Sequence, residues 1–187
     1  FLSAAALAGS LAAMTFASSA AQPDAAPVAG NRFAIVGARV FDGERDLGIA
    51  DVLVEEGRIA VVGKNLTVPA GLPVVSAEGS TLLPALIDAH THSWGDARGD
   101  ALRFGVGTEL DMLGDAARLP AIRTQRESLA RTAQADLWSA GHAVTAPGGH
   151  GTQYGMAVPT LAADGDAPAF VAARVAEGSD YLKLIVE

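Results

Sequence analysis

The chain contains no cysteine among its 187 residues, which excludes a disulfide framework, a thiolate metal site and a lipidated N-terminal cysteine. Any metal ion must therefore be held by histidine, carboxylate or a modified lysine. Positive charge is also scarce, because 13 Lys and Arg stand against 21 Asp and Glu, for a net charge of −8. Since nucleic-acid binding depends on clustered cations that neutralise phosphates, we expect no nucleic-acid partner.

The first 21 residues carry no charge, and small residues cluster at positions 17–21, just before Gln22, Pro23 and Asp24. This pattern is typical of the apolar region and cleavage site of a secretory signal. We therefore predict a partial signal peptide over residues 1–21, a linker over 22–31, and a periplasmic or secreted protein without stable membrane insertion after cleavage. The alternative is a transmembrane anchor, which the Ala and Ser content disfavours. Because the sequence starts at Phe1 without a charged leader, we expect the true N-terminus to lie upstream.

Residues 32–83 have the pattern of a small antiparallel β unit. Strands are predicted over residues 33–41, 51–55, 58–62 and 73–77, with turns at Asp42-Gly43 and Glu56-Gly57. The glycine of the second turn supplies the positive φ of a tight hairpin. A unit of this size rarely buries enough apolar surface to be stable alone, so we expect partner strands from elsewhere.

From residue 84 onward the pattern alternates between strand and helix, which indicates an α/β fold with a parallel sheet. Strands are predicted at residues 82–92, 105–112, 137–146 and 181–187, and helices at 96–104, 120–135 and 166–177. Four such units over residues 84–187 make the first half of a (β/α)8 TIM barrel. Because a half barrel leaves open edges, we expect the chain to be the front part of a protein of about 400 residues, given about 250 for a complete barrel.

Two histidines end the apolar run Leu-Leu-Pro-Ala-Leu-Ile-Asp-Ala-His-Thr-His at residues 82–92. Side chains alternate along a strand, so His90 and His92 share one face while Thr91 points to the other. Two imidazoles at this spacing can bind one divalent ion, and Asp88 is close enough to approach it. The alternative is a hydrogen-bonded polar pair on a half-buried strand. The apolar run upstream favours a buried strand that ends in a metal site.

This stretch resembles the first barrel strand of the amidohydrolase superfamily, where a Leu-Pro-Gly-Leu-Ile-Asp-like run ends in His-x-His. Ala85 replaces the usual glycine. The resemblance implies that strands from the end of the chain complete residues 32–83 as a composite β-sandwich. It also implies two further histidines and a proton-shuttling aspartate beyond Glu187, so the catalytic acid or base is not assigned to this chain.

Lys183 is predicted to lie in the fourth barrel strand, on the same face as Ile185 and Glu187. A lysine flanked by apolar residues is costly unless it is paired, neutralised or modified. One alternative is a partner carboxylate, for example Asp111. The other follows from the resemblance, which implies that carbon dioxide forms a carbamate on Lys183 that bridges metal ions held partly by His90 and His92. We expect one or two zinc ions, with manganese, iron or cobalt as alternatives.

The loop at residues 146–155, Ala-Pro-Gly-Gly-His-Gly-Thr-Gln-Tyr-Gly, follows the third predicted barrel strand and should overhang the metal face. His150 and Tyr154 are candidate substrate-binding residues, and Gln153 could shape the same pocket. An exposed turn is the alternative. A Gly-Gly-His-Gly loop here is similar to the imidazolonepropionase-like and Xaa-Pro dipeptidase-like branch of the superfamily. His142 is interpreted as a structural histidine.

These observations predict a metal-dependent hydrolase that cleaves an amide, peptide or cyclic amide C–N bond of a small molecule or dipeptide through a metal-activated hydroxide. Deamination and hydrolysis of organophosphates or lactones are alternatives within the enzyme class. A non-catalytic scaffold or binding protein with the amidohydrolase fold is the alternative from another class, and a membrane-anchored module built on the β unit is a third. Whether the protein forms a homo-oligomer is left open by the sequence.

Overall fold

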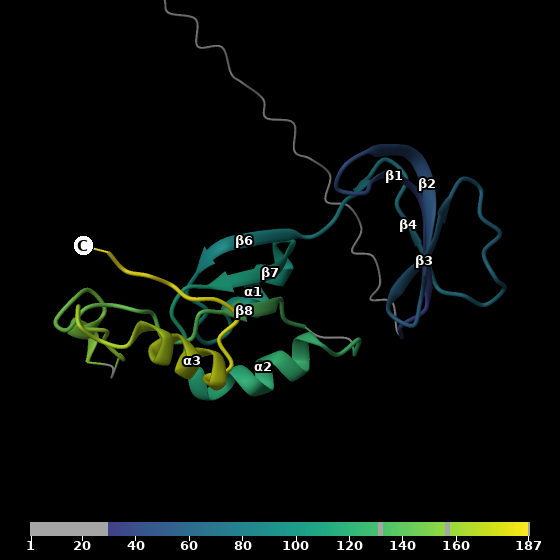
Figure 1. The fold of residues 1–187 in the computed structure, drawn as a ribbon. Helices are drawn as coiled ribbons and strands as arrows, with labels where there is room; N and C mark the ends of the chain where they lie inside the picture. Colours follow the sequence, from purple (N-terminus) through teal and green to yellow (C-terminus); the bar gives the residue numbers. More distant parts are fainter. Residues whose placement is uncertain (1–29, 131–132, 156–157, 187) are drawn as a thin grey trace, which may run out of the picture.

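A computed structural model describes residues 30–130, 133–155 and 158–186. The predicted signal peptide and most of the predicted linker lie outside the described residues. The described part contains a five-stranded sheet at its start and a three-stranded sheet with helices after it (Figure 1). Among these residues, no helix has the length and apolar character needed to span a bilayer.

The first sheet contains β1 (Phe33–Phe41), β2 (Asp46–Glu55), β3 (Arg58–Gly63), β4 (Val74–Ser76) and β5 (Thr81–Leu82). Its order is β3-β2-β1-β4, and β5 also pairs with β1. Its core is apolar and consists of Ala38, Val40, Ala50, Val52 and Val54. The hairpin between β2 and β3 forms as predicted, with φ of 51° at Glu56 and 73° at Gly57, as a type I′ turn requires.

The prediction of an antiparallel unit is only partly correct. β1, β2 and β3 are antiparallel neighbours, but β4 and β5 both run parallel to β1. The reason is the connection over residues 64–73, which brings the chain back to the starting end of β1 before β4 begins. A parallel neighbour needs such a crossover, whereas an antiparallel one needs only a tight turn.

The second sheet has the order β6-β7-β8 and is parallel throughout. Its strands are β6 (Leu86–Thr91), β7 (Val106–Asp111) and β8 (Asp136–Ser139), and its helices are α1 (Ala97–Arg103), α2 (Leu119–Arg126) and α3 (Ala167–Glu177). The short 3-10 turns η1 (Ala116–Arg118) and η2 (Thr152–Tyr154) lie between them. The mixed α/β class is therefore confirmed, while the half barrel and the β-sandwich stay predictions.

The strand that carries the two histidines was expected to be buried, and this is wrong for the part of the chain that the structure describes. Leu86 is 55% exposed and Ile87 is 65% exposed. The cause is the position of β6 at the edge of the sheet, where β7 is its only partner among the described residues.

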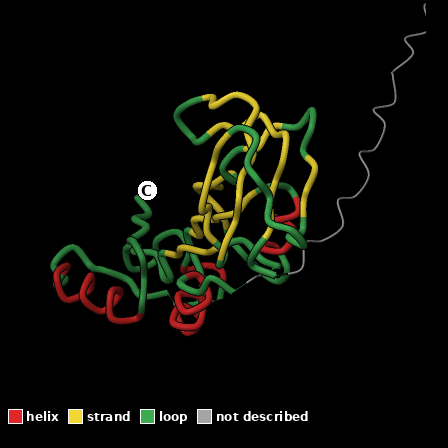
Figure 2. Tube along the Cα trace, turned by 90° about the vertical axis from the view of Figure 1, so that its right-hand side faces the viewer, coloured by secondary structure: helices red, strands yellow, loops and turns green. Residues whose placement is uncertain are grey.

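Three other predicted elements are shorter than expected. α2 ends at Arg126, well before residue 135. β8 ends at Ser139 instead of residue 146, because Gly141 takes a φ of 59° and turns the chain. Of the predicted strand at 181–187, residue 187 lies outside the described residues, and residues 181–186 form one bridge between Val144 and Leu184, since the shortened β8 provides no ladder for them. Figure 2 accordingly shows mostly loop near the C-terminal end of the chain.

The predicted ends of α3 are confirmed. The Asp166 carboxylate accepts a hydrogen bond from the Ala169 backbone N–H at 2.9 Å, which is the expected N-cap contact. Pro168 lies in the first turn, and Gly178 ends the helix with a φ of 102°. A left-handed residue at this position favours glycine.

Candidate active site

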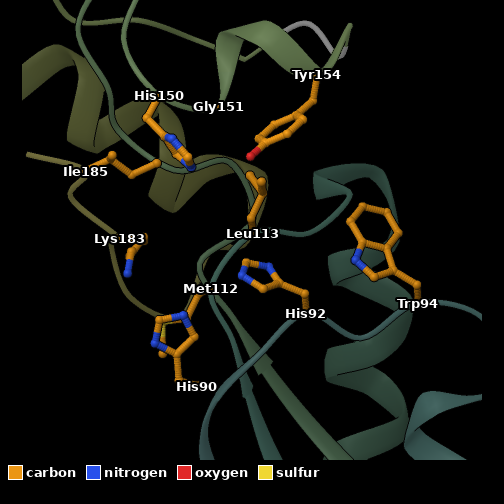
Figure 3. Close-up of a pocket in the computed structure, with 10 residues that line it drawn as sticks. All are labelled: His90, His92, Trp94, Met112, Leu113, His150, Gly151, Tyr154, Lys183 and Ile185. Atoms are coloured by element: carbon orange, nitrogen blue, oxygen red, sulfur yellow. The ribbon is translucent and has the colours of Figure 1, made fainter. Parts of the chain in front are cut away.

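A pocket of about 610 Å³ opens beyond the carboxyl ends of β6 and β7. In parallel α/β sheets, side chains that bind ligands gather at this edge because every strand ends there. Ten residues line the pocket: His90, His92, Trp94, Met112, Leu113, His150, Gly151, Tyr154, Lys183 and Ile185 (Figure 3). All five predicted site residues, His90, His92, Lys183, His150 and Tyr154, are among them.

His90 and His92 come from the end of β6 and the residue just beyond it. Their ring centroids lie 5.8 Å apart and the ring planes meet at 67°. Both rings are on the pocket side of the chain in Figure 3. Asp88 does not line the pocket. Its carboxylate accepts a hydrogen bond from the His90 backbone N–H at 3.1 Å. The two imidazoles are therefore free to face a common ligand.

Lys183 enters the pocket from the segment that follows α3. Its backbone carbonyl accepts a hydrogen bond from Val144 N at 2.8 Å, and the Val144 carbonyl accepts one from Ile185 N at 2.9 Å. The Lys183 side chain forms no hydrogen bond or ion pair with the residues that the structure describes. The alternative that Lys183 pairs with Asp111 is wrong within the described residues, because no ion pair joins the two side chains and the buried Asp111 carboxylate accepts a hydrogen bond from Ser139 Oγ at 2.7 Å.

A buried carboxylate fixes the segment just before Lys183. Asp180 accepts hydrogen bonds from Arg126 Nη1 at 3.0 Å and Nη2 at 2.9 Å, and from Ser139 N at 3.0 Å. Burial acts to raise the pKa of Asp180, but the hydrogen bonds from Arg126 and Ser139 outweigh it and hold the pKa below its usual value. This contact joins α2, β8 and the Lys183 segment, and no local sequence pattern indicated it.

Tyr181 provides a second attachment for the same segment. Its hydroxyl contacts the Asp111 carbonyl at 2.8 Å and the Trp138 carbonyl at 3.0 Å. These two carbonyls lie near the carboxyl ends of β7 and β8. Burial and the nearby charges of Asp111 and Asp180 raise the pKa of Tyr181, so the hydroxyl keeps its proton. The backbone that carries Lys183 is thus attached to both neighbouring strands.

The loop after β8 brings His150 and Tyr154 to the opposite wall of the pocket. Their rings meet edge to face with centroids 5.8 Å apart. Gln153 accepts a hydrogen bond from Gly151 N at 2.6 Å, and its amide lies 3.4 Å from His150 Nδ1. Gln153 therefore holds the shape of the loop, while His150 is directed toward the pocket.

His142 lies outside the pocket and just after β8, instead of inside a strand. Its Nδ1 is 3.5 Å from Glu177 Oε2. Within the described part of the chain, neither of these buried atoms has a hydrogen-bond partner. The position outside the pocket agrees with a structural role.

The described residues fit a divalent metal site in part. Two imidazoles suit zinc and related ions, and Lys183 would add oxygen ligands if it were carboxylated. Across residues 30–130, 133–155 and 158–186, however, no group of three or more His, Cys, Asp or Glu side chains could hold a metal ion. The pocket accordingly has some of the ligands of such a site and not a complete set.

Sequence reasoning missed the apolar part of the pocket, which comprises Trp94, Met112, Leu113 and Ile185. Trp94 lies two residues after His92, and this proximity was the one signal that could have identified it. Met112 and Leu113 directly follow β7, where apolar residues are equally common in an ordinary core.

No family model matches the chain. Local matches to curated proteins include a dihydroorotase of Geobacter sulfurreducens, 46% identical over 59 residues, which is 31% of this chain and 14% of that protein. A dihydroorotase of Mycobacterium tuberculosis is 38% identical over 73 residues, 39% of this chain and 16% of that protein. The aligned parts thus span a small share of these relatives.

Solved structures share the fold over more of the chain. A putative prolidase from Bifidobacterium longum has a TM-score of 0.62 and 22% identity, covering 86% of this chain and 42% of that one. A solved amidohydrolase has a TM-score of 0.62 and 21% identity, covering 82% of this chain and 46% of that one. The chain therefore spans less than half of either structure. The chain is therefore similar in sequence to dihydroorotases over a small part of their length, and it shares its fold with the solved amidohydrolase.

Proposed function

We propose that the chain is part of a metal-dependent amidohydrolase that hydrolyses an amide or cyclic amide C–N bond. One observation carries the proposal: His90 and His92 line a single pocket with His150 and Lys183, which are distant from them in sequence. The names of the relatives add two substrate classes, since dihydroorotase favours a cyclic amide and prolidase favours a dipeptide.

His90, His92 and a carboxylated Lys183 would hold the metal. A bound divalent metal supplies hydroxide at neutral pH and polarises a carbonyl oxygen. Lys183 would bind only after it loses its positive charge, because an ammonium group has no lone pair to donate. Carboxylation by carbon dioxide achieves this and adds two oxygen ligands.

The reaction adds water to the amide carbonyl carbon and breaks its bond to nitrogen, and the products are a carboxylate and an amine or amino group. His150 would donate a hydrogen bond to the carbonyl or to a carboxylate of the substrate, because its ring faces the pocket from the wall opposite His90 (Figure 3). No described residue is assigned as the acid that protonates the leaving nitrogen.

The test is metal analysis and turnover of the full-length protein and its histidine variants. We expect His90→Ala and His92→Ala to lose bound metal and to lower turnover to background. His142→Ala is the matched control, because His142 lies outside the pocket, and it should keep both. Stoichiometric metal in the His90 and His92 variants would contradict the assignment.

The role of Lys183 needs a separate test. Lys183→Ala should lose activity, and added short-chain carboxylic acids should restore part of it, because they can replace the carbamate oxygens. Full activity of Lys183→Ala without such an acid would rule out the bridging role.

We also propose that residues 1–21 direct export. N-terminal sequencing of the protein from its native host should then find a mature chain that starts near Gln22. A mature protein that keeps this segment would instead favour a membrane anchor.

A further inference from the structure

The pocket has two chemically different sides. In Figure 3, His90 and Lys183 lie on the side opposite Trp94 and Tyr154, with His92 and Leu113 between them. No lining residue is acidic, and the large side chains of Trp94, Leu113 and Tyr154 all line the pocket; these three residues are called the apolar wall. A metal site alone would not account for this wall.

Exposure of a single large apolar side chain is ordinary and carries no meaning alone. Trp94 is 52% exposed and Tyr154 is 61% exposed, yet both line the same concave site, and Leu113 lines it as well. Small-molecule sites typically combine such apolar walls with a few polar groups that fix orientation. The apolar wall therefore has the character of a recognition surface.

The Tyr154 hydroxyl adds an independent observation. It points into the pocket in Figure 3, and it forms no hydrogen bond with any residue in the described ranges. The ring edge meets His150 with centroids 5.8 Å apart. A hydrogen-bond donor thus stands next to the apolar wall and beside the imidazole that faces the reacting group.

We propose that the wall of Trp94, Leu113 and Tyr154 binds an aromatic or bulky apolar substituent of the substrate. This inference rests on the proposed function of the same pocket and names its substrate class: amides that carry such a substituent next to the cleaved bond. The substituent packs against the Trp94 ring, and the Tyr154 hydroxyl donates a hydrogen bond to a polar atom adjacent to it. A small substituent is too short to contact the wall, and a negatively charged one gains nothing from apolar contacts there, so both leave the three side chains exposed to solvent.

The test compares substrates that differ in one substituent. Hydantoins with a 5-benzyl or a 5-methyl group provide cyclic amides, and N-acetyl-phenylalanine and N-acetyl-alanine provide open-chain amides. For the metal-loaded full-length protein we expect kcat/KM at least roughly tenfold higher for the benzyl member of the active pair, because loss of apolar contacts in a pocket costs about that much or more. The difference should lie mainly in KM, since the wall contacts substrate and transition state alike.

Two variants separate the parts of the wall. Trp94→Ala should reduce the preference to within about threefold, whereas Tyr154→Phe should weaken both members of the pair equally and leave the preference unchanged. Phe104→Ala is the matched control, because Phe104 is 84% exposed and lies outside the pocket. An unchanged preference in Trp94→Ala, or no preference in the original protein, would overturn the inference while leaving the proposed function intact.

Calorimetric binding separates the two proposals if no amide is turned over. Absence of turnover would contradict the proposed function. The inference would still predict roughly tenfold tighter binding of the benzyl compound than of the methyl compound, and loss of this difference in Trp94→Ala. Equal affinities, or no binding of either compound, would overturn it.

Discussion

Replacement of Asp180 by alanine should destabilise the protein more than any single surface change, because it leaves a buried guanidinium without its carboxylate. The side chains of Asp180 and Arg126 are 8% and 9% exposed. Removing one partner of a buried ion pair typically costs about 3–5 kcal/mol. Arg126 would keep its hydrogen bond to the Leu137 carbonyl at 2.7 Å and its place 3.7 Å from the centre of the Trp138 ring. We therefore expect the lower end of that range, about 3 kcal/mol.

The assay is thermal and urea unfolding followed by circular dichroism. A loss of this size should lower the melting temperature by roughly 6–12 °C in a domain of this length. The control is Asp100→Ala, which breaks an exposed pair with Arg103 in which the Asp100 side chain is 61% exposed, and it should cost no more than about 0.5 kcal/mol. Equal stability of the Asp180 and Asp100 variants would refute the reasoning.

The difference between Asp180→Ala and the original protein should also depend on pH. Since the folded-state pKa of Asp180 is lowered, the carboxylate contributes fully above the unfolded pKa, near 3.8. Its contribution disappears as the pH falls through the lower folded value. The two proteins should therefore differ fully at pH 7 and converge below about pH 3.8. A difference that is unchanged in strong acid would mean that charge is not the cause.

Other expected outcomes follow from the same contacts. Tyr181→Phe removes the hydrogen bonds to the Asp111 and Trp138 carbonyls, and urea unfolding should show a loss of about 1–3 kcal/mol; an unchanged midpoint would argue against this attachment. Gly178→Ala places a Cβ on a residue with φ of 102°, so thermal unfolding should show a loss of about 1 kcal/mol or more; a stabilised variant would contradict the left-handed cap. Removal of metal by a chelator should lower the melting temperature of the full-length protein, and addition of zinc should restore it. A melting temperature that changes with neither the chelator nor zinc would count against a bound metal.

Local chemistry was sufficient to predict elements whose ends depend on their own residues. α3 begins at an N-cap aspartate and ends at Gly178, and both signals act within a few residues. The β2–β3 hairpin likewise follows from Gly57. The parallel placement of β4 and β5 could not be predicted, because it depends on the path of residues 64–73 across the sheet and not on the strand sequences.

The candidate site shows the same division. The strand pattern around His90 and His92 predicted where they would lie, and the order of elements predicted that Lys183 and the His150 loop would meet them. The contacts of Asp180 were unpredictable, because they join residues more than 40 positions apart. The failed pairing of Lys183 with Asp111 has the same origin, since the contact of Asp111 with Ser139 joins residues 28 positions apart.

The most direct test of the account is anomalous X-ray diffraction from crystals of the full-length protein grown with zinc. We predict an anomalous peak in the pocket within ligand distance of the His90 and His92 imidazoles, with density for a carbamate on Lys183 next to it. Stoichiometric zinc bound elsewhere, with these three side chains free of metal, would contradict the central claim.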